Sequence, residues 1–168
     1  TNSKEWQEKM VFAQKALGLQ PSPFDSWLIT RGVKTEAIRV ARHSENAHAL
    51  ASWLEGEANL PMVRYPFLES HPQCELARMQ MSAGGGIVVA DLGRSVEETV
   101  AFLKRLNFFT MAESLGGIES LVCHPASMTH ASVPREVRES VGITDSLVRF
   151  SVGIEHIDDL IADVKQAL

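Results

Sequence analysis

Residues 146–153 read SLVRFSVG, and their side chains alternate with a period of two. One face of this stretch carries Leu147, Arg149 and Ser151, and the other carries Val148, Phe150 and Val152. Successive side chains of a β-strand point to opposite faces, so the pattern predicts a strand with one apolar face. The arginine lies on a face that would otherwise be core or the wall of a cleft, which makes it a candidate for function.

Helical patterns precede and follow this strand. Ser95 stands three residues before Glu98, the spacing of a capping box at the start of a helix. Helices are expected near 2–17, 23–31, 35–55, 70–81, 96–106, 134–142 and 156–168, and strands near 62–66, 87–92, 107–113, 119–123 and 146–153. Helices that separate a few short strands predict an α/β (α+β two-layer) fold, with a short, mostly antiparallel sheet covered by helices.

Composition narrows the range of partners. The chain has 168 residues and a net charge of −5, so a basic surface for nucleic acid is not expected. No apolar run is long enough to cross a bilayer, and no secretory signal opens the sequence. The six histidines and two cysteines show no metal-ligand spacing. We expect a cytoplasmic protein with no membrane, nucleic-acid or metal partner.

Arg149 has two interpretations. A buried, unpaired guanidinium is costly, so this side chain needs an anion. The anion is either internal, with Asp145 or Glu155 as the partner, or the carboxylate of a substrate held by two parallel hydrogen bonds. The residues alone leave both interpretations open.

Residues 112–132, AESLGGIESLVCHPASMTHAS, are crowded with small and hydroxylated side chains. Gly116 and Gly117 allow the backbone to approach a ligand closely, Ser114 adds a hydroxyl, and Glu113 adds an anion at the same turn. A β-bulge or turn before the next strand explains the same residues equally well. No nucleophile stands beside a base, so we expect a binding segment without catalytic residues.

Taken together, four segments resemble the C-terminal part of the Cys/Met-metabolism enzymes, which use pyridoxal phosphate. The segments are 22–47, 65–92, 102–134 and 142–168. The family includes cystathionine γ-synthase, cystathionine γ-lyase, cystathionine β-lyase, methionine γ-lyase and the sulfhydrylases. The resemblance covers nearly the whole chain and implies the C-terminal domain of a fold-type I pyridoxal-phosphate enzyme.

The resemblance implies four substrate-binding residues. Arg149 matches the family's substrate-carboxylate arginine, and Ser114 matches the serine of its Ser-Leu-Gly-Gly loop. Thr129 lies near the same pocket in the family. Glu113 matches a variable position that influences the distal end of the substrate, and a glutamate there slightly favours γ-chemistry.

The resemblance also implies what this chain lacks. In the family, the cofactor lysine, the aspartate on the pyridine nitrogen, the stacking tyrosine and the phosphate-binding turn lie in the N-terminal half, and this chain begins after them. Lys34 belongs to the Arg-Gly-x-Lys-Thr element at 31–35 and is not the cofactor lysine. We therefore expect this chain alone to bind no cofactor and to be inactive, with pyridoxal phosphate present in the full-length enzyme.

These implications define an architecture and its alternative. Residues 1–56 would be linker helices that join the cofactor domain to a substrate-binding domain at 57–168. The expected partners are an amino-acid substrate, the N-terminal cofactor domain of the same enzyme, and further copies in a homotetramer. The resemblance does not choose among the family's reactions in cysteine and methionine metabolism. The alternative is a standalone, non-catalytic domain that binds amino acids or a partner protein.

Overall fold

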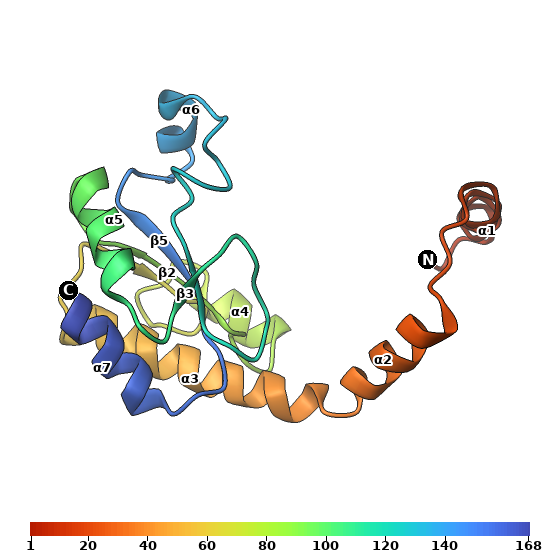
Figure 1. The fold of residues 1–168 in the computed structure, drawn as a ribbon, viewed down its shortest axis with the longest axis horizontal. Helices are drawn as coiled ribbons and strands as arrows, with labels where there is room; N and C mark the ends of the chain where they lie inside the picture. Colours follow the sequence, from red (N-terminus) through yellow and green to blue (C-terminus); the bar gives the residue numbers. More distant parts are fainter. The chain divides into compact units, whose positions relative to one another are not determined.

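The computed structural model describes all residues from 1 to 168 and contains two compact units, Thr1–Ala37 and Ile38–Leu168. In Figure 1 the chain runs from its N-terminus in red to its C-terminus in blue. The second unit includes most of α3 (Glu36–Gly56), which lies before the expected boundary at 56/57. The division of roles between 1–56 and 57–168 stays a prediction.

The N-terminal unit consists of α1 (Lys4–Leu17) and α2 (Pro23–Val33). Each helix begins at a serine whose side chain accepts a backbone N–H, Ser3 for α1 and Ser22 for α2. Neither helix buries a residue. Large apolar side chains are therefore exposed on both, among them Trp6, Met10, Phe12, Phe24 and Trp27.

A five-stranded sheet forms the centre of the second unit, in the order β1-β2-β5-β4-β3. The strands are β1 (Met62–Arg64), β2 (Ile87–Asp91), β3 (Thr110–Met111), β4 (Leu121–Cys123) and β5 (Leu147–Ser151). Every pairing is antiparallel except that of β3 with β4. The predicted fold class is confirmed, and the predicted strand at 146–153 is the central strand β5.

The core lies on the apolar face of β5. Phe150 stands opposite Val88 of β2 and Val122 of β4, and all three side chains are fully buried. Three helices, α3, α5 (Val96–Arg105) and α7 (Ile157–Ala167), supply the other side of this core, and Figure 1 shows them around the sheet. Because side chains alternate along a strand, Arg149 points away from this core.

The segment between α5 and β4 differs from the expected strand at 107–113. The carboxylate of Asp163 on α7 accepts the backbone N–H groups of Asn107 and Phe108, both at 2.8 Å, and of Phe109 at 3.3 Å. Burial by itself raises the pKa of Asp163, but these hydrogen bonds together hold it below its usual value. Donors bound to a side chain cannot join a sheet, so β3 is only Thr110–Met111.

The glycines at 84–86 form the segment that leads directly into β2. A Cβ on Gly84 would lie 2.5 Å from Cζ of Tyr65, so a side chain here would force the ring to shift. The Tyr65 hydroxyl donates to the carbonyls of Ser44 and Gly85, at 3.2 and 3.1 Å. Burial raises the pKa of Tyr65 to about 12. Gly84 thus packs directly against the Tyr65 ring, and Gly86 packs against His43.

Two short helices, α4 (Cys74–Gln80) and α6 (Arg135–Ser140), complete the unit. Both are shorter than the helices expected at 70–81 and 134–142. No helix of the chain combines the length and the apolar character that crossing a membrane requires.

Candidate functional site

The guanidinium of Arg149 is held by the backbone of the loop that precedes β4. Its Nη2 donates to the carbonyl of Glu113 at 2.8 Å and to that of Ser114 at 3.3 Å. Its Nε is buried and has no hydrogen-bond partner. A buried donor of a charged group without an acceptor is unusual in a folded protein. Two backbone carbonyls thus orient the Arg149 guanidinium, but no carboxylate of the chain pairs with it.

The internal salt bridge considered for Arg149 is absent. Asp145 pairs instead with Arg138 at 2.6 Å and with Arg135 at 3.1 Å. The Glu155 carboxylate accepts the backbone N–H and the hydroxyl of Ser120, at 2.7 and 2.9 Å. Both acidic residues are thus committed elsewhere, and that alternative is wrong. Arg149 thus forms no ion pair within the chain.

The loop from Glu113 to Ile118 is fastened to β5 and to the residues that follow it. Gly116 adopts a φ of 79°, a conformation that favours glycine, and its N–H donates to Ser151 Oγ at 2.8 Å. The carbonyl of Ile118 accepts the N–H of Ile154 at 2.9 Å. Backbone bonds on both sides of Gly116 therefore define the path of the loop.

Ser120 fixes the end of the same loop. Its hydroxyl donates to Glu155 and accepts the N–H of Gly153 at 2.8 Å. A Cβ on Gly153 would lie 2.4 Å from the carbonyl oxygen of Ile118, so only glycine allows this approach. Asn46 of α3 donates to the carbonyls of Gly153 and Glu155, at 3.0 and 2.8 Å. The loop, β5 and α3 thus share one polar network.

The structure brings three of the four predicted site residues into direct proximity. The carbonyls of Glu113 and Ser114 accept hydrogen bonds from Arg149. The side chains of Glu113 and Ser114 are exposed and make no hydrogen bond within the chain. Both side chains are therefore available to a ligand.

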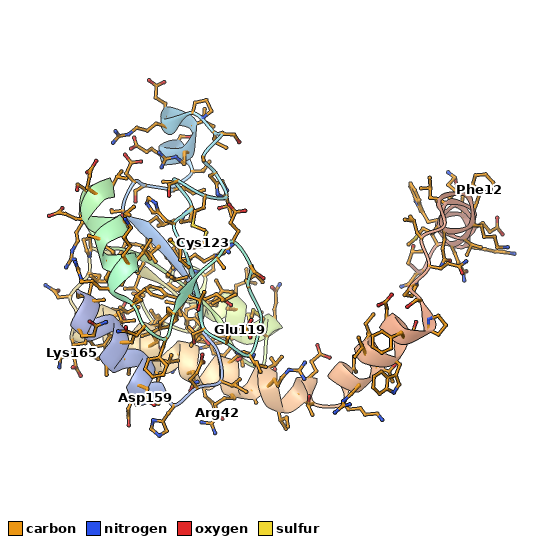
Figure 2. All side chains as sticks on the ribbon, in the orientation of Figure 1. Phe12, Arg42, Glu119, Cys123, Asp159 and Lys165 are labelled. Atoms are coloured by element: carbon orange, nitrogen blue, oxygen red, sulfur yellow. The ribbon has the colours of Figure 1, made fainter.

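Thr129 joins the other three only indirectly. Its hydroxyl lies 4.0 Å from Cys123 Sγ, and Cys123 stands opposite Arg149 across β4 and β5. The Thr129 hydroxyl also lies 2.8 Å from His130 Nδ1. Cys123 is labelled on its strand in Figure 2, with Glu119 near the start of the segment that leads into it. Thr129 is thus on the Arg149 side of the sheet.

A second polar cluster supports the segment that carries Thr129. His124 Nε2 donates to the carbonyl of Asp145 at 2.9 Å, which leaves Nδ1 to accept the Ser127 hydroxyl at 2.7 Å. The guanidinium of Arg138 holds the pKa of Asp145 below its usual value. Both ring nitrogens of His124 thus have hydrogen-bond partners within the chain. No group of three or more His, Cys, Asp or Glu side chains is placed to hold a metal ion.

Sequence reasoning missed Ser151, Ser120 and Arg138, and it considered Glu155 only as an ion-pair partner. The one signal in the sequence for Ser151 was a serine within a predicted core strand, and the structure shows that its side chain is only 3% exposed. The partners of Ser120 and Arg138 depend on loop paths that no residue pattern specifies.

Comparison with known proteins places this geometry in a family. The family model for the Cys/Met metabolism PLP-dependent enzymes matches residues 1–168. The chain is 50% identical to a cystathionine beta-lyase of Lactococcus lactis subsp. cremoris (strain MG1363) over 169 residues, which is 100% of this chain and 44% of that protein. It is 48% identical to a cystathionine gamma-lyase of Dictyostelium discoideum over 168 residues, covering 100% of this chain and 43% of that protein.

A solved structure gives the same result. The cystathionine gamma synthase from Xanthomonas oryzae pv. oryzae, in complex with aminoacrylate and cysteine, matches with a TM-score of 0.92 and 42% identity. That match covers 99% of this chain and 43% of that one. The chain thus spans less than half the length of the relatives it matches. On the family match and these identities, the chain belongs to the Cys/Met metabolism PLP-dependent enzymes.

Proposed function

We propose that residues 1–168 are the C-terminal, substrate-binding part of a pyridoxal-phosphate-dependent transsulfuration enzyme. Its substrates would be sulfur amino acids or O-acyl-homoserine. The observation that carries the proposal is Arg149, an oriented guanidinium with a buried, unpartnered Nε and no internal anion. Guanidinium and carboxylate groups match in two parallel hydrogen bonds, so Arg149 would hold the α-carboxylate of the amino acid.

The chain's own residues do not fit a site that anchors the cofactor. All six lysines lie on α1, α5 and α7 or at the end of α2: Lys4, Lys9, Lys15, Lys34, Lys104 and Lys165. None belongs to the Arg149 strand or its loop. Gly84 and Gly86 pack against Tyr65 and His43, and a strand rather than a helix follows them, unlike a phosphate-binding loop. We propose that the cofactor is anchored outside this chain and that the isolated chain is inactive.

The contribution of this chain would be orientation. Pyridoxal phosphate, when bound, supplies the electron sink for a carbanion at the substrate's α-carbon. A fixed Arg149 would hold the amino acid in one pose, so that its α-proton stands where removal is favoured. Ser114 would present its exposed hydroxyl to the carboxylate, Glu113 would face the distal end of the substrate, and Thr129 would border the pocket.

The remaining proposals concern partners. Residues 1–56 would join the cofactor domain of the same enzyme to the substrate domain at 57–168. The apolar side chains exposed on α1 and α2 support contact with further protein, either that domain or another subunit of a homo-oligomer. Both cysteines are free, as in the reducing cytoplasm where we place the protein.

Turnover by the full-length protein tests the proposal. The protein is loaded with pyridoxal phosphate and given cystathionine, O-acyl-homoserines and methionine in turn. We expect turnover of at least one substrate, and none by residues 1–168 alone. Binding of an amino acid with no turnover of any substrate by the loaded full-length protein would instead favour a non-catalytic binding domain.

A further inference from the structure

Ser151 is a second polar side chain on the Arg149 face of β5. It follows Arg149 by two residues, is 3% exposed, and accepts the Gly116 N–H at 2.8 Å. A buried hydroxyl needs a hydrogen-bond partner, and here the partner is a loop amide. One strand thus supplies both the guanidinium and a fixed attachment point for the loop that orients it.

The two attachment points define a short segment of loop. Arg149 holds the carbonyls of Glu113 and Ser114, and Ser151 holds the amide of Gly116 only two residues later. Gly116 has a φ of 79° and no atom within 4 Å of the place where a Cβ would stand. No side chain packs where its Cβ would stand, and its N–H is held by the hydrogen bond to Ser151.

We infer that Ser151 is a positioning residue for substrate binding, acting through the loop and Arg149. Its hydroxyl sets the path of residues 113–116, so that two carbonyls restrain Nη2 and Arg149 turns its other donors toward the substrate carboxylate. Ser151 itself touches only the loop. The inference rests on the proposed role of Arg149.

Removal of the hydroxyl should therefore loosen Arg149 without unfolding the sheet. In Ser151→Ala the Gly116 N–H loses its acceptor, and the glycine gains conformations that displace both carbonyls. Loss of one neutral hydrogen bond changes an equilibrium by roughly two- to tenfold. We expect KM for the amino-acid substrate to rise by that factor and kcat to change less.

The test uses the full-length holoenzyme and two readouts. Hydrogen exchange of the 113–117 segment should speed up in Ser151→Ala by roughly tenfold at Gly116, and KM should rise. Ser151→Cys, with a weaker acceptor of similar volume, should give intermediate values. Ser146→Ala is the matched control, because Ser146 is also buried but donates to Asp91 away from the loop. A purely structural role would lower the active fraction and leave KM unchanged.

Two outcomes separate this inference from the proposed function. If Arg149→Ala raises KM but Ser151→Ala leaves both KM and Gly116 exchange at wild-type values, the positioning role is overturned and the function stands. If Arg149→Ala leaves KM unchanged, the carboxylate site itself is wrong. Faster Gly116 exchange in Ser151→Ala would then still show that Ser151 holds the loop. The proposed role of Ser151 in substrate binding would nevertheless be overturned, together with the carboxylate site.

Discussion

Arg149 Nη2 donates to the main-chain carbonyl of Glu113 at 2.8 Å, across 36 positions of sequence. The contact joins the central strand to a loop through a backbone atom that every residue possesses. The side chain at position 113 can therefore change without loss of the contact that orients the guanidinium. Under the proposed function, this separation would let the loop vary toward the substrate while the guanidinium stays fixed.

Arg149→Ala should abolish most substrate binding by the full-length enzyme. Removal of one partner from a hydrogen-bonded charge pair costs about 2–5 kcal/mol, which should appear in kcat/KM mainly through a higher KM. Arg149→Lys keeps the charge but loses the planar fork, so we expect a smaller defect. Arg42→Ala, on the exposed surface of α3 (Figure 2), controls for loss of one positive charge. Near-normal kinetics in Arg149→Ala would contradict the assignment.

The sequence was most informative where a periodic pattern determines structure. The alternation at 146–153 predicted β5 and the orientation of Arg149, because only one face of the strand is apolar at every position. It could not identify the partner of Arg149, because that partner is a carbonyl and carries no residue signature. The same limit explains the expected strand at 107–113, where Asp163 binds amides that the pattern assigned to a sheet.

The arginines of α6 should differ sharply in their effect on stability. Arg138 is buried and donates to Asp145 at 2.6 Å and to the carbonyl of Ile143 at 2.9 Å. Arg135 also pairs with Asp145, but its side chain is 67% exposed. Hydrogen bonds to charged groups contribute about 1.5–3 kcal/mol, so Arg138→Ala should lower the free energy of unfolding by that amount. Solvent screening should make Arg135→Ala much milder.

Urea unfolding of both α6 variants, followed by circular dichroism, measures this difference. Equal midpoints for the two variants would show that the buried arginine does not anchor the segment between α6 and β5.

Asp163→Asn should destabilise the contact between α5 and α7 at neutral pH. The carboxylate accepts three consecutive backbone N–H groups, and an amide would turn a donor toward some of them. We expect a loss of about 2–3 kcal/mol in the free energy of unfolding. Asp159→Asn, on an exposed position of the same helix (Figure 2), is the matched control.

The loss in Asp163→Asn should depend on pH with a definite sign. The pKa of Asp163 is lower in the folded chain than its usual value of 3.8, so its stabilisation is complete above that value. The stabilisation disappears as the pH falls through the folded pKa. Unfolding midpoints of wild type and Asp163→Asn should therefore converge in acid, and a constant gap would contradict the role of the charge.

Gly84→Ala should destabilise the fold because its Cβ would meet the ring of Tyr65 at 2.5 Å. Overpacking of a rigid aromatic site costs about 1–3 kcal/mol. Gly56→Ala, at the end of α3, has open space around its Cβ and should instead stabilise the protein by about 0.4–1 kcal/mol. Thermal unfolding of the two variants should move in opposite directions. A Gly84→Ala variant as stable as wild type would show that the ring of Tyr65 can move away, and that the glycine is not required by packing.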